Sequence, residues 1–333
     1  MNKAFEPITP SGDPSHRVSS LWGAHEGRLN SVEVLVRRAD EGDVVVRRAG
    51  AQPPHRRRPR GPREERLGIH VRKTAGMSVL ADLTAALSSG SVEVIDLTAK
   101  LSSETPLLEL PPEFGQTARF ELEEISRYDE RGPAWYWNNF RTGEHTGTHF
   151  DAPIHWVTGK DQSDVATVPV SAFVAPAVVI DVVEHVAADP DFLIGIEHLE
   201  AFMAEHGPFP AGGWLLCRTG WSSRVTQVEM INNTATGPTS PGMSPECARW
   251  VAEESPLQGI GVETIGTDAG AAHSFDPPFP CHAFLLGNGK YGLAQLQNLS
   301  ALPPTGAVVV AAPLRIVGGS GSPVRVLALV DRG

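Results

Sequence analysis

Short apolar stretches, separated by turn residues, recur along residues 77–333. Stretches that are rich in β-branched residues and bounded by Gly, Pro or Asp are predicted to be strands. They cover residues 92–97, 175–182, 214–219, 260–268, 306–312 and 324–330. Together with the helices predicted between them, these strands indicate an α/β domain.

Helices are predicted over residues 195–206, ended by Gly207, and over residues 245–254. Ser244 is a suitable N-cap for the second helix, because its hydroxyl can accept a hydrogen bond from a free backbone N–H. Pro245 then fits the first helical position. A further helical pair is predicted within residues 281–300, and GGSGSP (318–323) is interpreted as a turn before the last strand.

Residues 1–76 differ from the rest of the chain in their charge and in their lack of an apolar pattern. They contain 15 Lys and Arg against 9 Asp and Glu, whereas residues 77–333 contain 13 against 30. The basic excess lies mainly in PPHRRRPRGPREER (53–66), which has no apolar periodicity. Such a segment cannot bury enough apolar surface to offset the entropy of ordering. We therefore expect a disordered extension over 1–76, or a start assigned upstream of Met77, and one domain over 77–333. A tail that binds nucleic acid or another anionic partner is the alternative.

Composition narrows the class of protein. The net charge of -11 argues against a nucleic-acid-binding protein, and 41% hydrophobic residues suit a globular enzyme. No apolar run approaches the roughly 20 residues of a membrane-spanning helix. Cys217, Cys247 and Cys281 form no CxxC pair, which favours a reducing, cytoplasmic compartment.

The strongest chemical signal is HTGTHFDAPIH (145–155). In an extended chain the odd-numbered residues His145, His149, Asp151 and His155 share one face. A straight strand would separate the first two by roughly 13 Å, too far to bind one ion. Gly147 is therefore predicted to bend the chain. Two imidazoles and a carboxylate suit zinc, manganese or non-haem iron.

Aromatic residues precede this motif in AWYWNNF (134–140). Trp135, Trp137 and Phe140, together with Trp156, are predicted to form a slot for a planar substrate. Packing in the core is the alternative for each of them.

The pattern HxGTHxDxPxH, matched by residues 145–155, resembles the signature of the metal-dependent cyclase superfamily, which includes bacterial kynurenine formamidases and isatin hydrolases. The resemblance covers roughly residues 77–333. TDAG (267–270), FDPPFPCH (275–282) and KYGLAQLQNL (290–299) are most similar to the isatin hydrolase branch. The resemblance implies a central mixed β barrel or sheet flanked by helices, in a homodimer.

The resemblance also implies roles for single residues. His145, His149 and Asp151 would be metal ligands, and His155 the general acid or base. In the formamidase branch a later His and Glu hold a second zinc; His282 matches that His, but Gln295 stands where the Glu would be. We therefore expect one divalent ion, manganese or zinc, with Gln295 as a fourth ligand and His282 near the substrate. His273 is a weaker candidate ligand.

The expected function is a metal-dependent hydrolase that opens an isatin-like lactam or cleaves an aryl formamide. His155 would take a proton from water and return it to the leaving nitrogen. One alternative is a cyclase or dehydratase of secondary metabolism on the same scaffold. A non-haem iron oxygenase would need His149, Asp151 and a distant His, which leaves His145 without a role. A non-catalytic metal-binding protein would have no use for His155.

Overall fold

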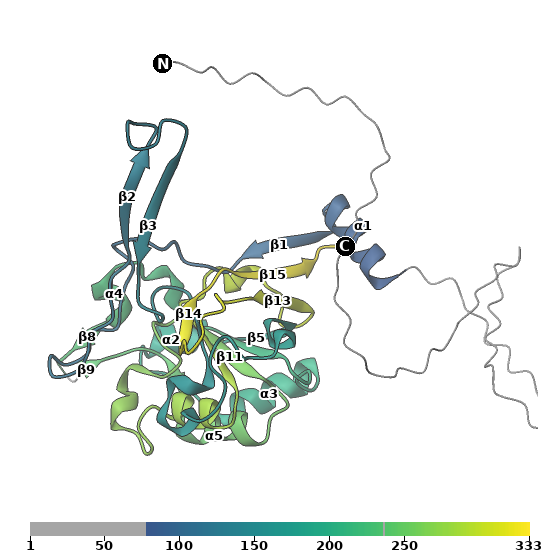
Figure 1. Ribbon diagram of the computed structural model, residues 1–333. Helices are drawn as coiled ribbons and strands as arrows, with labels where there is room; N and C mark the ends of the chain where they lie inside the picture. Colours follow the sequence, from purple (N-terminus) through teal and green to yellow (C-terminus); the bar gives the residue numbers. More distant parts are fainter. Residues whose placement is uncertain (1–77, 236) are drawn as a thin grey trace, which may run out of the picture. The chain divides into compact units, whose positions relative to one another are not determined.

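The computed structural model describes residues 78–235 and 237–333, so the predicted extension over 1–76 lies outside the described residues. The central element is a nine-stranded sheet in the order β1-β15-β13-β5-β7-β11-β12-β4-β14 (Figure 1). Its strands are β1 (Val92–Asp96), β4 (His149–Asp151), β5 (Val174–Asp181), β7 (Trp214–Arg218), β11 (Gly259–Val262), β12 (Tyr291–Ala294), β13 (Ala307–Ala311), β14 (Gly321–Pro323) and β15 (Val326–Asp331). The four strands from β5 to β12 pair in parallel and the others pair antiparallel. The predicted mixed sheet is confirmed.

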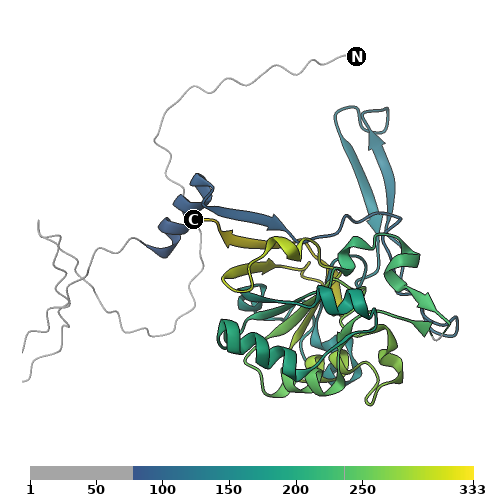
Figure 2. The same ribbon diagram turned by 180° about the vertical axis from the view of Figure 1, so that it is seen from behind.

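Helices and three small two-stranded sheets complete the described chain (Figures 1 and 2). The helices are α1 (Val79–Ser89), α2 (Val183–Ala188), α3 (Ile196–His206), α4 (Gln227–Ile231) and α5 (Pro245–Glu253), with a π-helix at His282–Leu286. The small sheets pair β2 (Glu121–Arg127) with β3 (Tyr136–Arg141), β6 (Leu193–Ile194) with β10 (Gly242–Met243), and β8 (Asn233–Thr234) with β9 (Gly237–Pro238). The helices predicted at 195–206 and 245–254 are both present, and the Ser244 hydroxyl accepts from Cys247 N as expected for an N-cap.

Both faces of the parallel strands are buried. On β7, Trp214 and Leu216 belong to one apolar cluster, while Leu215 belongs to a second cluster that includes residues of α3 and α5. Burial on both faces explains why this strand reads as an unbroken apolar run. The first cluster is closed by the sheet itself, because Phe150 of β4 meets Trp214 with ring centroids 6.3 Å apart, although two strands lie between them. The sheet is therefore curled.

Three details of the predicted elements are wrong. The second helix predicted within 281–300 is the strand β12, which pairs with both β11 and β4. The strand predicted over 260–268 ends at Val262, because the Glu263 carboxylate accepts hydrogen bonds from Thr219 N and Gly220 N beyond the sheet. The predicted turn at 318–323 contains β14, which pairs with β4. In the two regions taken for helix and turn, pairing with distant strands overrides the local pattern.

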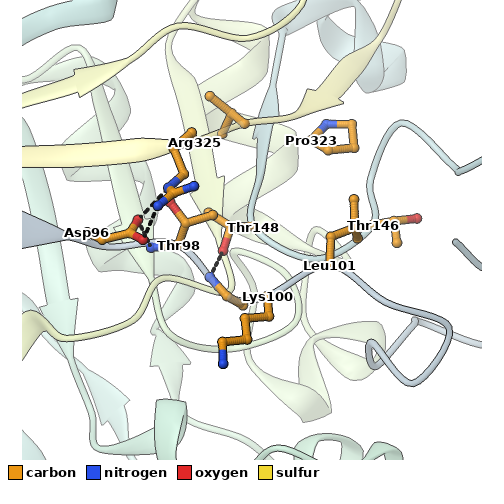
Figure 3. Close-up of a pocket in the computed structure, with 10 residues that line it drawn as sticks. Asp96, Thr98, Lys100, Leu101, Thr146, Thr148, Pro323 and Arg325 are labelled. Carbon is orange, nitrogen blue, oxygen red and sulfur yellow. Dashed lines mark hydrogen bonds and ion pairs between the residues drawn. The ribbon is translucent and has the colours of Figure 1, made fainter. Parts of the chain in front are cut away.

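A pocket of about 500 Å³ adjoins the segment that leads into β4 (Figure 3). Thr146 and Thr148, the even-numbered neighbours of the histidines, line it. Thr148 Oγ1 accepts from Ala99 N at 2.9 Å and donates to Gln295 O at 2.6 Å. Arg325 forms an ion pair with Asp96 at 2.7 Å. The two bonds of Thr148 tie the motif to residues 99 and 295.

Candidate metal centre

Strand β4 sets the direction of the central side chains. It lies between β12 and β14, so its backbone is held on both edges. Phe150 packs into the first apolar cluster, and His149 and Asp151 therefore point to the opposite face. Both are buried, with Asp151 only 1% exposed.

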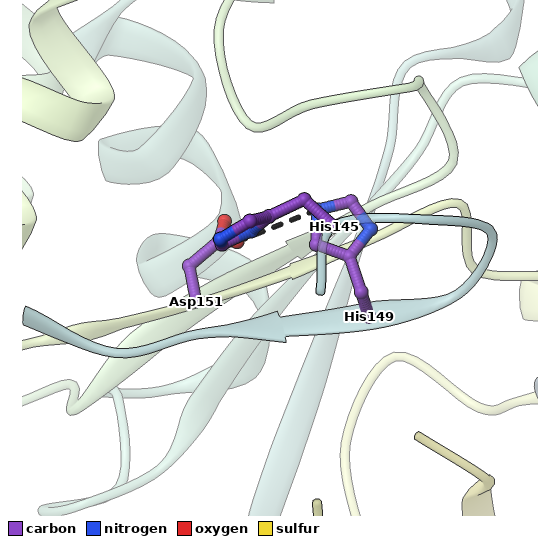
Figure 4. A group of neighbouring side chains, drawn as sticks. All are labelled: His145, His149 and Asp151. Carbon is purple, nitrogen blue, oxygen red and sulfur yellow. Dashed lines mark hydrogen bonds and ion pairs between the residues drawn. The ribbon is translucent and has the colours of Figure 1, made fainter. Parts of the chain in front are cut away.

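His145 joins them because the chain bends at Gly147, which has φ of +65°. That conformation favours glycine. His145 Nδ1 lies 2.7 Å from Asp151 Oδ1, and His149 Nε2 lies 3.4 Å from the same oxygen (Figure 4). One ligand atom from each of the three residues lies within 4.8 Å of the others. The predicted bend is confirmed, and only residues 149–151 of the motif form a strand.

Two glycines make room for this group. Gly292 of β12 and Gly321 of β14 both pair with Asp151, one from each neighbouring strand. A Cβ on Gly292 would lie 2.6 Å from Asp151 Oδ2, and a Cβ on Gly321 would lie 2.5 Å from His145 Cε1. Any larger residue at either position would displace a proposed ligand.

The charges of the group suit a cation. Burial alone would raise the pKa of Asp151, but His149 and His145, through their charge when protonated and through their hydrogen bonds, hold that pKa well below its usual range, so Asp151 is a carboxylate. His149 Nδ1 lies 2.7 Å from Gly147 O, so it carries the proton that this carbonyl accepts and leaves Nε2 free as a donor atom. Two imidazole nitrogens and a buried carboxylate fit zinc or manganese.

His155 lies directly on this group. Pro153–His155 forms a single 3₁₀ turn, and the His155 ring stacks on His145 with centroids 3.8 Å apart. Burial lowers the pKa of His155 to about 3; Asp151 opposes this shift and the neighbouring histidines add to it. His155 is therefore a neutral imidazole at neutral pH, with a lone pair available to accept a proton.

His282 and Trp156 form the adjoining wall. Their ring centroids lie 4.8 Å apart, and His282 lies 5.4 Å from His155. His282 Nδ1 is hydrogen-bonded to Asp268 Oδ2 at 2.5 Å. Burial lowers the pKa of His282, but the hydrogen bond and charge of Asp268 outweigh burial, so the net shift is upward.

The other predicted site residues have different surroundings. Gln295 is buried and follows Ala294, which pairs with His149; its Nε2 donates to Pro106 O at 3.1 Å. His273 is exposed and is not one of the three clustered ligands. Trp135, Trp137 and Phe140 lie on or beside β3 and are 49%, 55% and 59% exposed. Among the ring contacts of the described residues, none joins these three to His155, Trp156 or His282.

The sequence reading missed three polar residues of the site. Asp268 holds His282, Ser320 contacts His145, and Glu144 contacts Ser320. Glu144 immediately precedes the motif, and Ser320 lies in the stretch interpreted as a turn. Among residues 78–235 and 237–333, no helix combines the length and apolar character that crossing a membrane requires.

Comparison with known proteins agrees with this geometry. A model of the Cyclase family matches residues 95–269. Isatin hydrolase of Roseibium aggregatum is 46% identical over 262 residues, which cover 78% of this chain and 99% of that protein. Kynurenine formamidase of Salinibacter ruber is 30% identical over 188 residues, 56% of this chain and 76% of that protein.

A solved structure has the same fold. The crystal structure of an isatin hydrolase bound to the product analogue thioisatinate is 46% identical in sequence, with a TM-score of 0.75. The match covers 77% of this chain and 100% of that one. The buried His/His/Asp cluster on β4 lies within the span that the family model matches. The chain belongs to the Cyclase family, whose members include isatin hydrolase.

Proposed function

We propose that this protein is a metal-dependent hydrolase that opens the ring of an isatin-like lactam. The observation that carries the proposal is the neutral, buried His155 stacked on a cluster of His145, His149 and Asp151. The 46% identity to isatin hydrolase supports the substrate class. In the reaction water adds to the lactam carbonyl, the C–N bond breaks, and the nitrogen takes up a proton.

One divalent ion, manganese or zinc, is part of this proposal. His145, His149 and Asp151 would hold it, with the amide oxygen of Gln295 as a fourth ligand. Gln295 is neutral, so the site would offer a single carboxylate, too little negative charge for two dications. A bound ion would supply Lewis-acid chemistry, which polarises a carbonyl and lowers the pKa of water.

His155 would move the proton. As a neutral imidazole it accepts a proton from the attacking water, and the resulting imidazolium donates the proton to the leaving nitrogen. Its low pKa favours the second transfer, because the imidazolium formed in a buried site is a strong acid. Among the ring contacts of the described residues, His155 is the imidazole outside the cluster that stacks on it.

Trp156 and His282 would contact the planar substrate on one side. We still propose that substrate is bound by Trp135, Trp137 and Phe140. We also propose that the protein is a homodimer and that these residues lie where the two copies meet. The β2–β3 hairpin extends away from the large sheet in both views (Figures 1 and 2). Its exposed rings offer apolar area that a second copy could cover.

We also propose that the protein is cytoplasmic, since its three buried cysteines are free. The proposed catalytic domain covers residues 77–333.

An ultraviolet assay of isatin ring opening tests the function. Protein loaded with manganese or zinc should turn over isatin, protein treated with chelator should not, and elemental analysis should find one ion per chain. An active protein that needs two ions would restore the formamidase-like two-metal site. A fully loaded protein without turnover of isatin would refute the substrate class.

A further inference from the structure

His145 is held from outside the proposed ligand cluster by a serine and a glutamate. His145 Nε2 lies 2.8 Å from Ser320 Oγ, although 175 residues separate them in the chain. Ser320 Oγ donates to Glu144 Oε2 at 2.6 Å, and Ser320 N donates to the same oxygen at 3.0 Å. One carboxylate oxygen therefore accepts two hydrogen bonds from one serine.

The direction of these bonds fixes the proton on His145. A serine hydroxyl has one hydrogen, and here it is donated to Glu144. The same oxygen can therefore only accept from the imidazole, so Nε2 carries the proton. His145 Nδ1 is then the ring nitrogen that faces the cluster, 2.7 Å from Asp151 Oδ1. A proton or a bound cation between these two atoms would satisfy both, and a cation would use the Nδ1 lone pair of the tautomer that has its proton on Nε2.

We propose that Glu144 and Ser320 are positioning residues that hold His145 as an Nδ1 metal ligand. The inference rests on the proposed metal site and extends it by two residues. Glu144 orients the serine hydroxyl, the hydroxyl fixes the imidazole tautomer, and the tautomer directs the Nδ1 lone pair at the ion. Carboxylate-linked contacts of this kind fix the orientation of a ligating imidazole and raise its basicity.

The backbone makes this arrangement rigid. Ser320 directly precedes β14, and its carbonyl accepts from Ala152 N at 2.9 Å, so Ser320 is tied to the end of β4. Gly321 leaves space for the His145 ring. Glu144 is adjacent to His145 in the chain. The stretch GGSGSP (318–323) thus supplies two features of the site: Gly321, which has no side chain, and the hydroxyl of Ser320.

Metal affinity is the direct test. Metal-free protein would be titrated with zinc or manganese against a chromophoric chelator. Ser320→Ala and Glu144→Ala should each weaken binding by about 10–100-fold, the usual cost of losing such a contact. Glu144→Gln keeps an acceptor without the charge and should cost less. Because the two residues act in series, the double variant should bind about as weakly as Ser320→Ala.

Ser103 and Glu104 provide a matched control, since they form an exposed serine–glutamate hydrogen bond at 3.3 Å outside the site. Ser103→Ala and Glu104→Gln should leave metal affinity unchanged. A second readout is the nitrogen-15 spectrum of the zinc-loaded parent, which should place the His145 proton on Nε2. Parent-like affinity in folded Ser320→Ala, or a proton on Nδ1, would overturn the proposal. A parent that binds the ion but fails to hydrolyse isatin would refute only the proposed function.

Discussion

The metal centre and the β2–β3 hairpin differ in how fully neighbouring residues hold their side chains. At the centre, each histidine of the cluster has one ring nitrogen fixed by a neighbour, and two glycines leave room for the ligands. On the hairpin, Trp135, Trp137 and Phe140 are about half exposed, and the Phe140 ring stacks on Phe120. A single chain therefore already holds the residues proposed for the chemistry in place, whereas the hairpin aromatics stay exposed and available to another surface.

The largest expected effect comes from removing a ligand. Asp151→Ala should lose bound metal and isatin turnover together, because it removes the only carboxylate of the cluster. Elemental analysis after dialysis and the ultraviolet assay measure the two losses. Asp164→Ala is the control, since Asp164 is a carboxylate that caps a turn through Thr167 and Gly318. Stoichiometric metal in folded Asp151→Ala would show that the ion binds elsewhere.

His155→Ala should separate chemistry from metal binding. Turnover should fall by about 10²–10⁴-fold, the usual contribution of general acid–base catalysis, while the ion stays bound. The paired measurements are kcat and metal content. Loss of the ion in this variant would instead make His155 a ligand and would enlarge the cluster.

Gly321→Ala should disturb the centre without changing any proposed ligand. The new Cβ would lie 2.5 Å from His145 Cε1 and from the backbone oxygen of Phe150, and overpacking of this kind costs about 1–3 kcal/mol of unfolding free energy. Metal affinity should fall as well. Gly266→Ala is the matched control, because nothing lies within 4 Å of its Cβ position. Equal denaturation midpoints for the two variants would contradict the close packing of β14 against His145.

The low pKa of His155 predicts a dependence of stability on pH in the metal-free protein. Between about pH 6.5 and pH 3 this residue binds a proton in the unfolded chain but not in the folded one, so the unfolding free energy should fall as pH falls. By pH 5 the contribution reaches up to about 2 kcal/mol, at about 1.4 kcal/mol per pH unit. Urea titrations at pH 7 and pH 5 should therefore show a smaller loss for His155→Asn than for the parent. The same loss in both would place the His155 pKa near its ordinary value.

The smallest effect on stability is expected on the hairpin. Trp137→Ala should change the unfolding free energy by less than about 0.5 kcal/mol, because the ring is half exposed. It should nevertheless raise KM and weaken self-association in sedimentation experiments, if the hairpin meets a second copy. Val170→Ala, which removes an exposed apolar side chain elsewhere, serves as the control. Unchanged self-association in Trp137→Ala would leave the hairpin outside the dimer interface.

The sequence by itself determined the local features of the centre. The spacing of His145, His149 and Asp151 around Gly147 was enough to predict a bend, because a straight strand cannot bring the two imidazoles to one ion. Gly207 and Ser244 likewise marked helix ends correctly, because capping depends only on backbone atoms nearby in the sequence. The six predicted strands are present because their apolar runs match burial in the sheet.

Tertiary structure alone decided which distant residues meet. β12 became a strand rather than a helix because β11 and β4 offered hydrogen bonds on both its edges. Ser320 reached His145, and Asp268 was set beside His282, only once the sheet and its connections were formed. The Ser320–His145 contact depends on the pairing of β14 with β4 across more than a hundred residues, and such pairing leaves no periodic signal in the local sequence. The candidate ligands could therefore be predicted from the motif, whereas the residues proposed to orient them could not.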